Sequence, residues 1–97
     1  MTTDFTELKS LAALKRAIIV GSRLRVIDHW NPELRGTRRV ITKIQTNGAY
    51  FEVPGIEKWK NGWMPYPSAK AISFPAPGRF RVDLDERFWE LEFEAMP

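Results

Sequence analysis

The alternation of apolar and polar residues is clearest in the middle of the chain, over residues 38–53. Two β-prone runs flank Asn47-Gly48, a dipeptide that suits a two-residue turn with positive φ at both positions. Because such a turn fixes the strand register, it places Ile44 opposite Phe51. The predicted core face holds Val40, Thr42, Ile44, Phe51 and Val53, and the predicted solvent face holds Arg39, Ile41, Lys43, Gln45, Tyr50 and Glu52.

A helix and a strand are predicted before this hairpin. Residues 4–16 place apolar side chains at three- and four-residue spacing, and Asp4 with Glu7 has the spacing of a capping box. Residues 22–28 alternate with period two, which is typical of a strand. In this strand the apolar residues Leu24 and Val26 lie on one face, and Arg23, Arg25 and Ile27 lie on the other.

Shorter elements are predicted in the second half. The dipeptide Asn61-Gly62 indicates a small hairpin between residues 57–60 and 63–66, and its second arm contains a proline that cannot donate to a ladder. Residues 68–71 are expected to form one helical turn before a short extended piece over 72–74.

A last hairpin closes the chain. Matching apolar to apolar side chains predicts a four-residue loop over 85–88 with Leu84 opposite Trp89. This register pairs Arg81 with Glu92 and Arg79 with Glu94, which gives the glutamates a structural role.

These elements predict a mainly β (α+β) protein in which an N-terminal helix, residues 4–16, precedes five or six short antiparallel strands, residues 18–96. A chain of 97 residues is expected to form a single domain over 1–97. So few residues bury one face of such a sheet most readily by curling it into a small barrel.

Charge is distributed unevenly. Residues 1–49 contain nine basic and four acidic residues, whereas residues 50–97 contain six and eight. The basic half favours an anionic partner, either nucleic acid or an acidic protein surface. The chain has no cysteine and no long apolar run, so we expect a cytoplasmic protein without disulfides or a membrane span.

The segments Gly21-Ser-Arg-Leu-Arg-Val and Gly36-Thr-Arg-Arg-Val-Ile-Thr-Lys-Ile resemble the first two strands of SH3-like barrels of the KOW and Tudor type. The resemblance covers residues 21–53, and it departs from the KOW pattern at Gly36, where one glycine replaces a pair. It implies an SH3-like barrel. The overall layout also resembles small accessory proteins of phages and mobile elements.

No catalytic or metal-binding motif is visible in the sequence. His29 is the only histidine, and its neighbour Asp28 points to the opposite face of a strand. Too few ligands accompany His29 for a transition metal, and the phosphate-cradling glycine loops and nucleophile motifs are absent. We therefore expect a non-enzymatic binding module without a cofactor.

Nucleic acid is the favoured partner. Basic side chains neutralise phosphates, and exposed aromatic rings stack on bases. Two groups carry this hypothesis: the strand-face residues Arg23, Arg25, Arg39, Lys43, Gln45 and Tyr50, and the segment Lys58, Trp59 and Lys60.

The alternative is a protein-interaction module. Trp30, Trp59 and Tyr66 lie near prolines and could anchor a partner's peptide. For a phage-type protein, this partner would be a host protein that handles nucleic acid, inhibited by the contact. Sequence alone leaves both alternatives open.

Overall fold

The structure, a computed structural model, describes residues 8–94. Within that range one helix, α1 (Leu11–Ala17), precedes seven strands, where the sequence predicted five or six. The strands are β1 (Arg23–His29), β2 (Arg38–Gln45), β3 (Gly48–Glu52), β4 (Gly62–Pro65), β5 (Ile72–Ala76), β6 (Arg79–Leu84) and β7 (Arg87–Phe93). Three 3-10 turns lie in the connections: η1 (Pro32–Leu34), η2 (Glu57–Trp59) and η3 (Ala69–Ala71). The protein is mainly β, as predicted.

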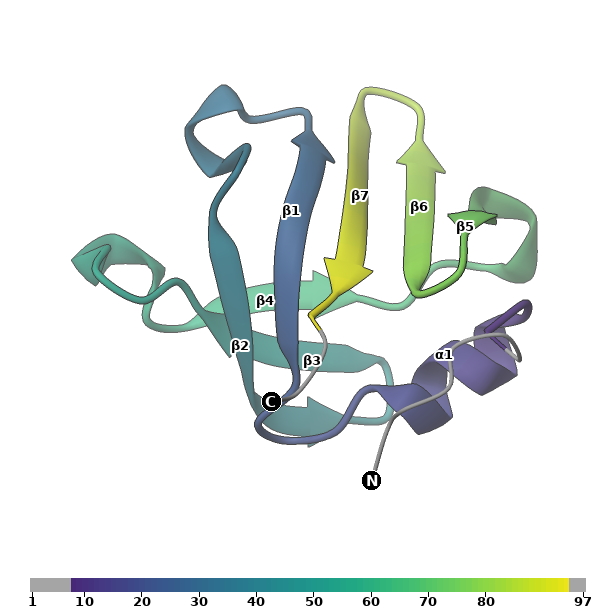
Figure 1. Cartoon of the computed structure of the whole chain (residues 1–97), viewed down its shortest axis with the longest axis horizontal. Helices are drawn as coiled ribbons and strands as arrows, with labels where there is room; N and C mark the ends of the chain where they lie inside the picture. The colour runs from purple at the N-terminus through teal and green to yellow at the C-terminus, as the bar shows by residue number, and fades with distance from the viewer. Residues whose placement is uncertain (1–7, 95–97) are drawn as a thin grey trace.

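All seven strands belong to one antiparallel sheet with the order β4-β3-β2-β1-β7-β6-β5, which leaves β4 and β5 as edges and does not close. Figure 1 shows β1, β7 and β6 running side by side while β3 and β4 cross behind them. The two parts of the bent sheet enclose a single apolar core. Its members from the strands include Leu24, Val26, Ile41, Ala49, Phe51, Met64, Phe80, Val82, Trp89, Leu91 and Phe93.

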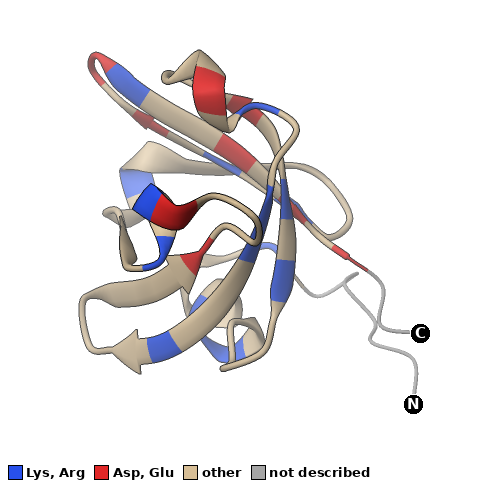
Figure 2. Cartoon of the chain, turned by 90° about the vertical axis from the view of Figure 1, so that its left-hand side faces the viewer, with Lys and Arg blue, Asp and Glu red and all other residues tan. Residues whose placement is uncertain are grey.

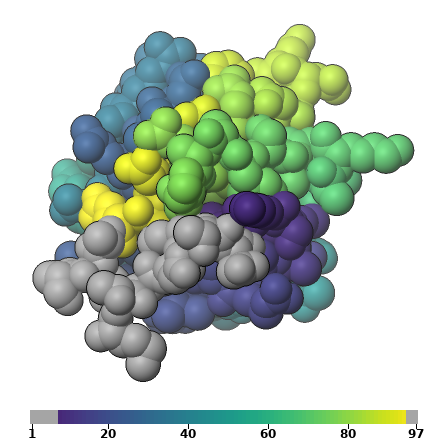
Figure 3. All heavy atoms as spheres, turned by 45° about the vertical axis from the view of Figure 1, so that its right-hand side comes forward, coloured from purple at the N-terminus to yellow at the C-terminus, as the bar shows by residue number. Residues whose placement is uncertain are grey.

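The helix is shorter than predicted. It begins at Leu11, where the Ser10 side chain accepts a hydrogen bond from the Ala13 N–H at 3.1 Å, and the preceding residues 8–10 are not helical. The predicted cap at Asp4 lies outside the described residues. Leu14 is buried in the core, and Figure 3 shows α1 (purple) packed beneath the green chain that leads into β5.

The central hairpin forms, but its turn is not the predicted one. Gln45 pairs with Gly48, so the two turn residues are Thr46 and Asn47, and Gly48 does not have a positive φ. A Cβ at Gly48 would meet the Met64 carbonyl oxygen and the neighbouring backbone of β4. The glycine therefore permits the close approach of β4, and the predicted partners are shifted by two residues.

A β-bulge in β2 overturns part of the face assignment. The register shifts between Ile41 and Lys43, so Thr42 has no partner in β3. An extra residue of this kind reverses which alternate side chains face the core. Arg39 is only 3% exposed and Ile41 only 1%, so both lie in the core. Ile44, after the bulge, pairs with the buried Ala49 and keeps its predicted face, although its side chain is 39% exposed. The predicted faces at the start of β2 are therefore wrong, because the sequence gives no sign of the bulge.

The predicted second hairpin is also wrong. Residues 57–59 form η2, and β4 pairs with β3 instead. A Cβ at Gly62 would overlap the Phe51 ring, so this glycine, like Gly48, is required for close packing and not for a turn. The predicted helical turn and extended piece over 68–74 are confirmed as η3 and the start of β5.

The last hairpin keeps its predicted faces with a different register. Leu84 pairs with Arg87, so the loop has two residues, and Asp85 takes a φ of 40°. The shift of two residues preserves the alternation, and Trp89 is buried as predicted. The cross-strand ion pairs form with new partners, including Arg79 with Glu92.

Candidate binding site

A cavity of about 200 Å³ lies between the two parts of the sheet. β1 ends and β7 begins beside it, at the end of these strands that lies away from α1 (Figure 1). Its lining residues are His29, Trp30, Leu34, Arg39, Phe51, Trp59, Trp63, Met64, Pro65, Arg87 and Trp89.

All four tryptophans of the chain line this cavity. Trp89 is buried, whereas Trp30 and Trp63 are each 42% exposed and give the cavity an accessible aromatic rim. Trp59 is stacked on Phe51, with the ring planes at 16° and the centroids 6.3 Å apart. The walls therefore present flat aromatic faces, and no sequence signal other than the abundance of tryptophan indicated that these residues converge.

Arg39 is the buried charged group of the cavity. In the ladder it lies opposite Leu24, on the core face. Its guanidinium carbon is 4.1 Å from the centroid of the Phe51 ring, and its Nε is buried without a hydrogen-bond partner. It forms no ion pair within residues 8–94, and burial lowers its pKa to about 10. At neutral pH, Arg39 is therefore a buried cation for which none of the described residues supplies a counter-charge.

His29 contributes a second polar group. Its Nδ1 accepts a hydrogen bond from the Asn31 N–H at 2.9 Å, so the proton of the neutral imidazole is on Nε2. Burial, together with the positive charges of Arg39 and Arg35, lowers the pKa of His29 to about 4. The side chain is therefore a neutral hydrogen-bond donor in this site at physiological pH.

The polar side chains of the lining are nearly all donors. They are the guanidinium groups of Arg39 and Arg87, the imidazole N–H of His29 and the four indole N–H groups. The Nε1 atoms of Trp59 and Trp89 are buried without a partner, and no carboxylate, hydroxyl or amide side chain lines the cavity in the described part of the chain. Such a site matches a group rich in hydrogen-bond acceptors.

Cations also surround the cavity. Arg87 lies over the Trp30 ring, with its guanidinium carbon 5.3 Å from the ring centroid. Near Trp59, Lys58 pairs with Glu33 at 2.7 Å and Lys60 pairs with Glu57 at 2.8 Å. Exposed ion pairs of this kind are weak, so an incoming anion can exchange for the glutamates.

The predicted basic face is only partly formed. Arg23, Arg25 and Lys43 are exposed and form no ion pair with any residue in the range 8–94. Gln45 is exposed as well, and Tyr50 packs against Trp63 with the ring centroids 4.9 Å apart. Arg39 does not belong to this face, because the bulge turns it into the core. Figure 2 shows basic and acidic residues interspersed along the strands instead of a uniformly basic surface.

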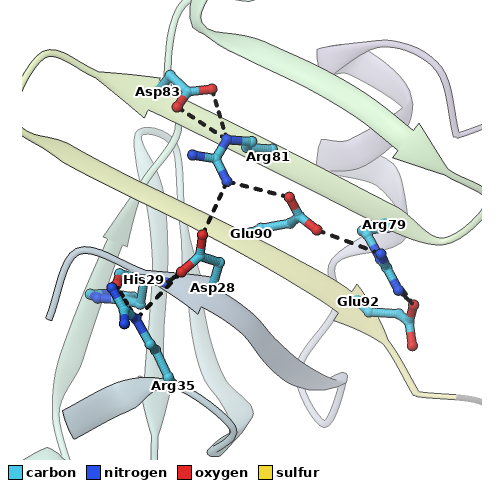
Figure 4. A network of polar contacts seen from close by, with 8 residues as sticks. All are labelled: Asp28, His29, Arg35, Arg79, Arg81, Asp83, Glu90 and Glu92. Atoms are coloured by element: carbon cyan, nitrogen blue, oxygen red, sulfur yellow. Dashed lines mark hydrogen bonds and ion pairs between the residues drawn. The ribbon is translucent and has the colours of Figure 1, made fainter. Parts of the chain in front are cut away.

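A polar network occupies the outer face of β1, β6 and β7 (Figure 4). Arg81 contacts Asp83, Glu90 and Asp28, and Asp28 also pairs with Arg35 at 3.4 Å. Each of these carboxylates has an arginine partner, which confirms the structural role that the sequence predicted for the glutamates of β7.

Residues 8–94 contain no group of three or more His, Cys, Asp or Glu side chains that could hold a metal ion. In the same range, no helix is long and apolar enough to cross a membrane.

Comparison with known proteins found no matching family model, no matching curated protein and no matching solved structure.

Proposed function

We propose that this protein is a non-enzymatic binding module that takes one unpaired base of a single-stranded nucleic acid into the tryptophan-lined cavity. The observation that carries the proposal is the combination of flat aromatic walls with hydrogen-bond donors and a buried arginine. Stacking on aromatic rings supplies roughly 1–3 kcal/mol per base and holds any base by its π-face. The donors complement the carbonyl and ring-nitrogen acceptors of a base.

The size of the cavity supports a single inserted group. A volume of about 200 Å³ is below the roughly 300–1,000 Å³ of pockets that enclose a drug-sized ligand. One group of a larger partner fits this space while the remainder of the partner stays on the surface. An unpaired base projecting from a strand is such a group.

The surrounding cations fit the backbone of the same strand. Arg87 beside the exposed Trp30, together with Lys58 in η2 and Lys60 directly after it, would contact phosphates next to the inserted base. Arg23, Arg25 and Lys43 add long-range attraction from the outer face. An SH3-like barrel left open between β4 and β5 is the fold we propose for this arrangement, because it accounts for both the bend of the sheet and the open end that holds the cavity.

Fluorescence anisotropy with labelled single-stranded DNA and RNA of about eight nucleotides tests this function. We expect binding that weakens steeply as salt rises, together with quenching of tryptophan fluorescence. The Arg39→Met variant should lose most of the binding. Lys70→Met, which removes an exposed cation of η3 outside the cavity, is the matched control. Absence of binding at low salt, or equal binding by parent and Arg39→Met, would contradict the proposal.

A second function is favoured by the charge of Arg39, for which residues 8–94 supply no counter-charge. A carboxylate from an acidic protein partner would neutralise this cation, which a neutral base does not. Acidic peptides should then quench tryptophan fluorescence while oligonucleotides fail to bind. An aromatic-anchored protein contact should also depend much less on salt than phosphate binding does.

A further inference from the structure

We infer that the cavity selects guanine among the bases, through a two-acceptor contact between its O6 and N7 atoms and Arg39. This inference depends on the proposed function, since it names the group that the cavity accepts. It follows from three features: the polarity of the lining, the depth of Arg39 and the geometry of a guanidinium group.

The polarity of the lining favours guanine over adenine. The site offers donors from Arg39, His29 and the indoles, and its described side chains include no carboxylate that could accept from a ligand. Guanine presents two neighbouring acceptors, O6 and N7, on one edge. Adenine places an amino donor beside its N7, and that donor would face other donors in this cavity. The lining therefore disfavours adenine.

The buried position of Arg39 favours guanine over the pyrimidines. Arg39 is 3% exposed, so an acceptor pair must lie well away from the sugar to reach it. Guanine O6 is remote from the glycosidic bond. Cytosine offers the acceptor pair O2 and N3, but O2 is adjacent to the glycosidic bond, so the sugar would have to enter the cavity with it. Thymine and uracil have an N–H between their two carbonyl groups, which leaves a donor facing Arg39.

The guanidinium group itself favours a paired acceptor. Its N–H groups form a rigid fork that matches two adjacent acceptors, and arginine contacts guanine O6 and N7 in this way more often than any other base edge. Arg39 forms no ion pair with the described residues, so its donors are available to a ligand. A purine also presents a larger face than a pyrimidine to the exposed indole rings of the cavity rim, Trp30 and Trp63.

The test uses oligothymidine of about eight nucleotides with one central base replaced by guanine, adenine, cytosine, inosine or 7-deazaguanine. Guanine should bind about 5- to 150-fold more tightly than adenine or cytosine, the range expected for a good bidentate pair. Inosine keeps both O6 and N7 and should match guanine. The 7-deaza base lacks the N7 acceptor and should lose most of the preference.

The Arg39→Lys variant provides a second readout. Lysine keeps the positive charge but has no fork, so the variant should retain salt-dependent binding and lose the preference for guanine over adenine. Circular dichroism and thermal unfolding check that the variant folds. The comparison of guanine with 7-deazaguanine on the parent protein does not depend on that outcome.

The outcomes distinguish a failure of guanine selection from a failure of nucleic-acid binding. Equal binding of all the central bases would overturn guanine selection and leave nucleic-acid binding intact. Failure to bind any oligonucleotide, with no response to guanosine monophosphate, would overturn both. If free guanosine monophosphate binds as tightly as the guanine-containing strand, the base selection stands, the ligand is a free nucleotide, and the proposed nucleic-acid function is wrong.

Discussion

Replacing Arg39 with methionine should make the protein more stable while it removes binding. Arg39 lies in the core with its guanidinium over the Phe51 ring and no acceptor for its Nε. Methionine is unbranched like the arginine stem, fits irregular apolar space and carries no charge. A residue that costs folding energy and is required for a ligand is expected at a binding site, because function and stability often conflict there.

The size of the effect follows from two opposing terms. Burial lowers the pKa of Arg39 from its ordinary value to about 10, which corresponds to roughly 3 kcal/mol of destabilisation of the charged form at neutral pH. The cation–π contact between the guanidinium and the Phe51 ring stabilises the folded state by about 1–2 kcal/mol, because it is desolvated. We therefore expect Arg39→Met to raise the free energy of unfolding by about 1–2 kcal/mol.

Urea unfolding followed by tryptophan fluorescence measures this change, since all four tryptophans line the cavity next to Arg39. The control is Arg25→Met, at an exposed position of β1, which should change the unfolding free energy by no more than about 0.5 kcal/mol. A loss of about 2 kcal/mol or more in Arg39→Met would refute the reasoning, because it would mean that the guanidinium stabilises the folded protein.

Two further changes test the electrostatics and the register. The pKa of His29 is about 4 in the folded protein and 6.5 when unperturbed, so the unfolded chain binds the proton first as pH falls. In urea unfolding, the free energy of unfolding should therefore be constant above about pH 7 and lower by about 2 kcal/mol at pH 5. The His29→Gln variant should lack this pH-dependent loss of stability. Ile41→Asp should lower the free energy of unfolding by about 3 kcal/mol or more, because it buries an unpaired carboxylate. Ile44→Asp, at a partly exposed position, should lower it by less than about 1 kcal/mol. The opposite order would support the strand faces predicted from the sequence.

The sequence was informative where local pattern decides structure. The alternation of Leu24 and Val26 with arginines identified β1 and its faces as far as Val26, where the register shifts, and the alternation around Trp89 identified the buried side of β7. Both predictions depend only on period two and on the burial of apolar side chains. A register error of two residues in the last hairpin did not change the faces, because two is the period of the strand.

Prediction failed where a distant strand decides the local structure. Gly48 and Gly62 are glycines because β3 and β4 leave no space for a Cβ, but in the sequence each follows an asparagine and so resembles a turn residue. The bulge at Thr42 has no residue signature at all. It arises as β2 passes from one part of the bent sheet to the other, and it shifts every preceding residue of the strand to the opposite face.

The misplacement of Arg39 has the same origin and explains why the sequence did not reveal the candidate site. An arginine that alternates with apolar residues is ordinarily solvent-exposed, because an unpaired buried charge is strongly unfavourable. The bulge places Arg39 inside, and no described carboxylate offsets its charge. Since no carboxylate among the described residues pairs with Arg39, the proposed function takes the compensating interaction from a ligand. The buried arginine, which alternation could not predict, is therefore the residue on which the proposed binding function depends.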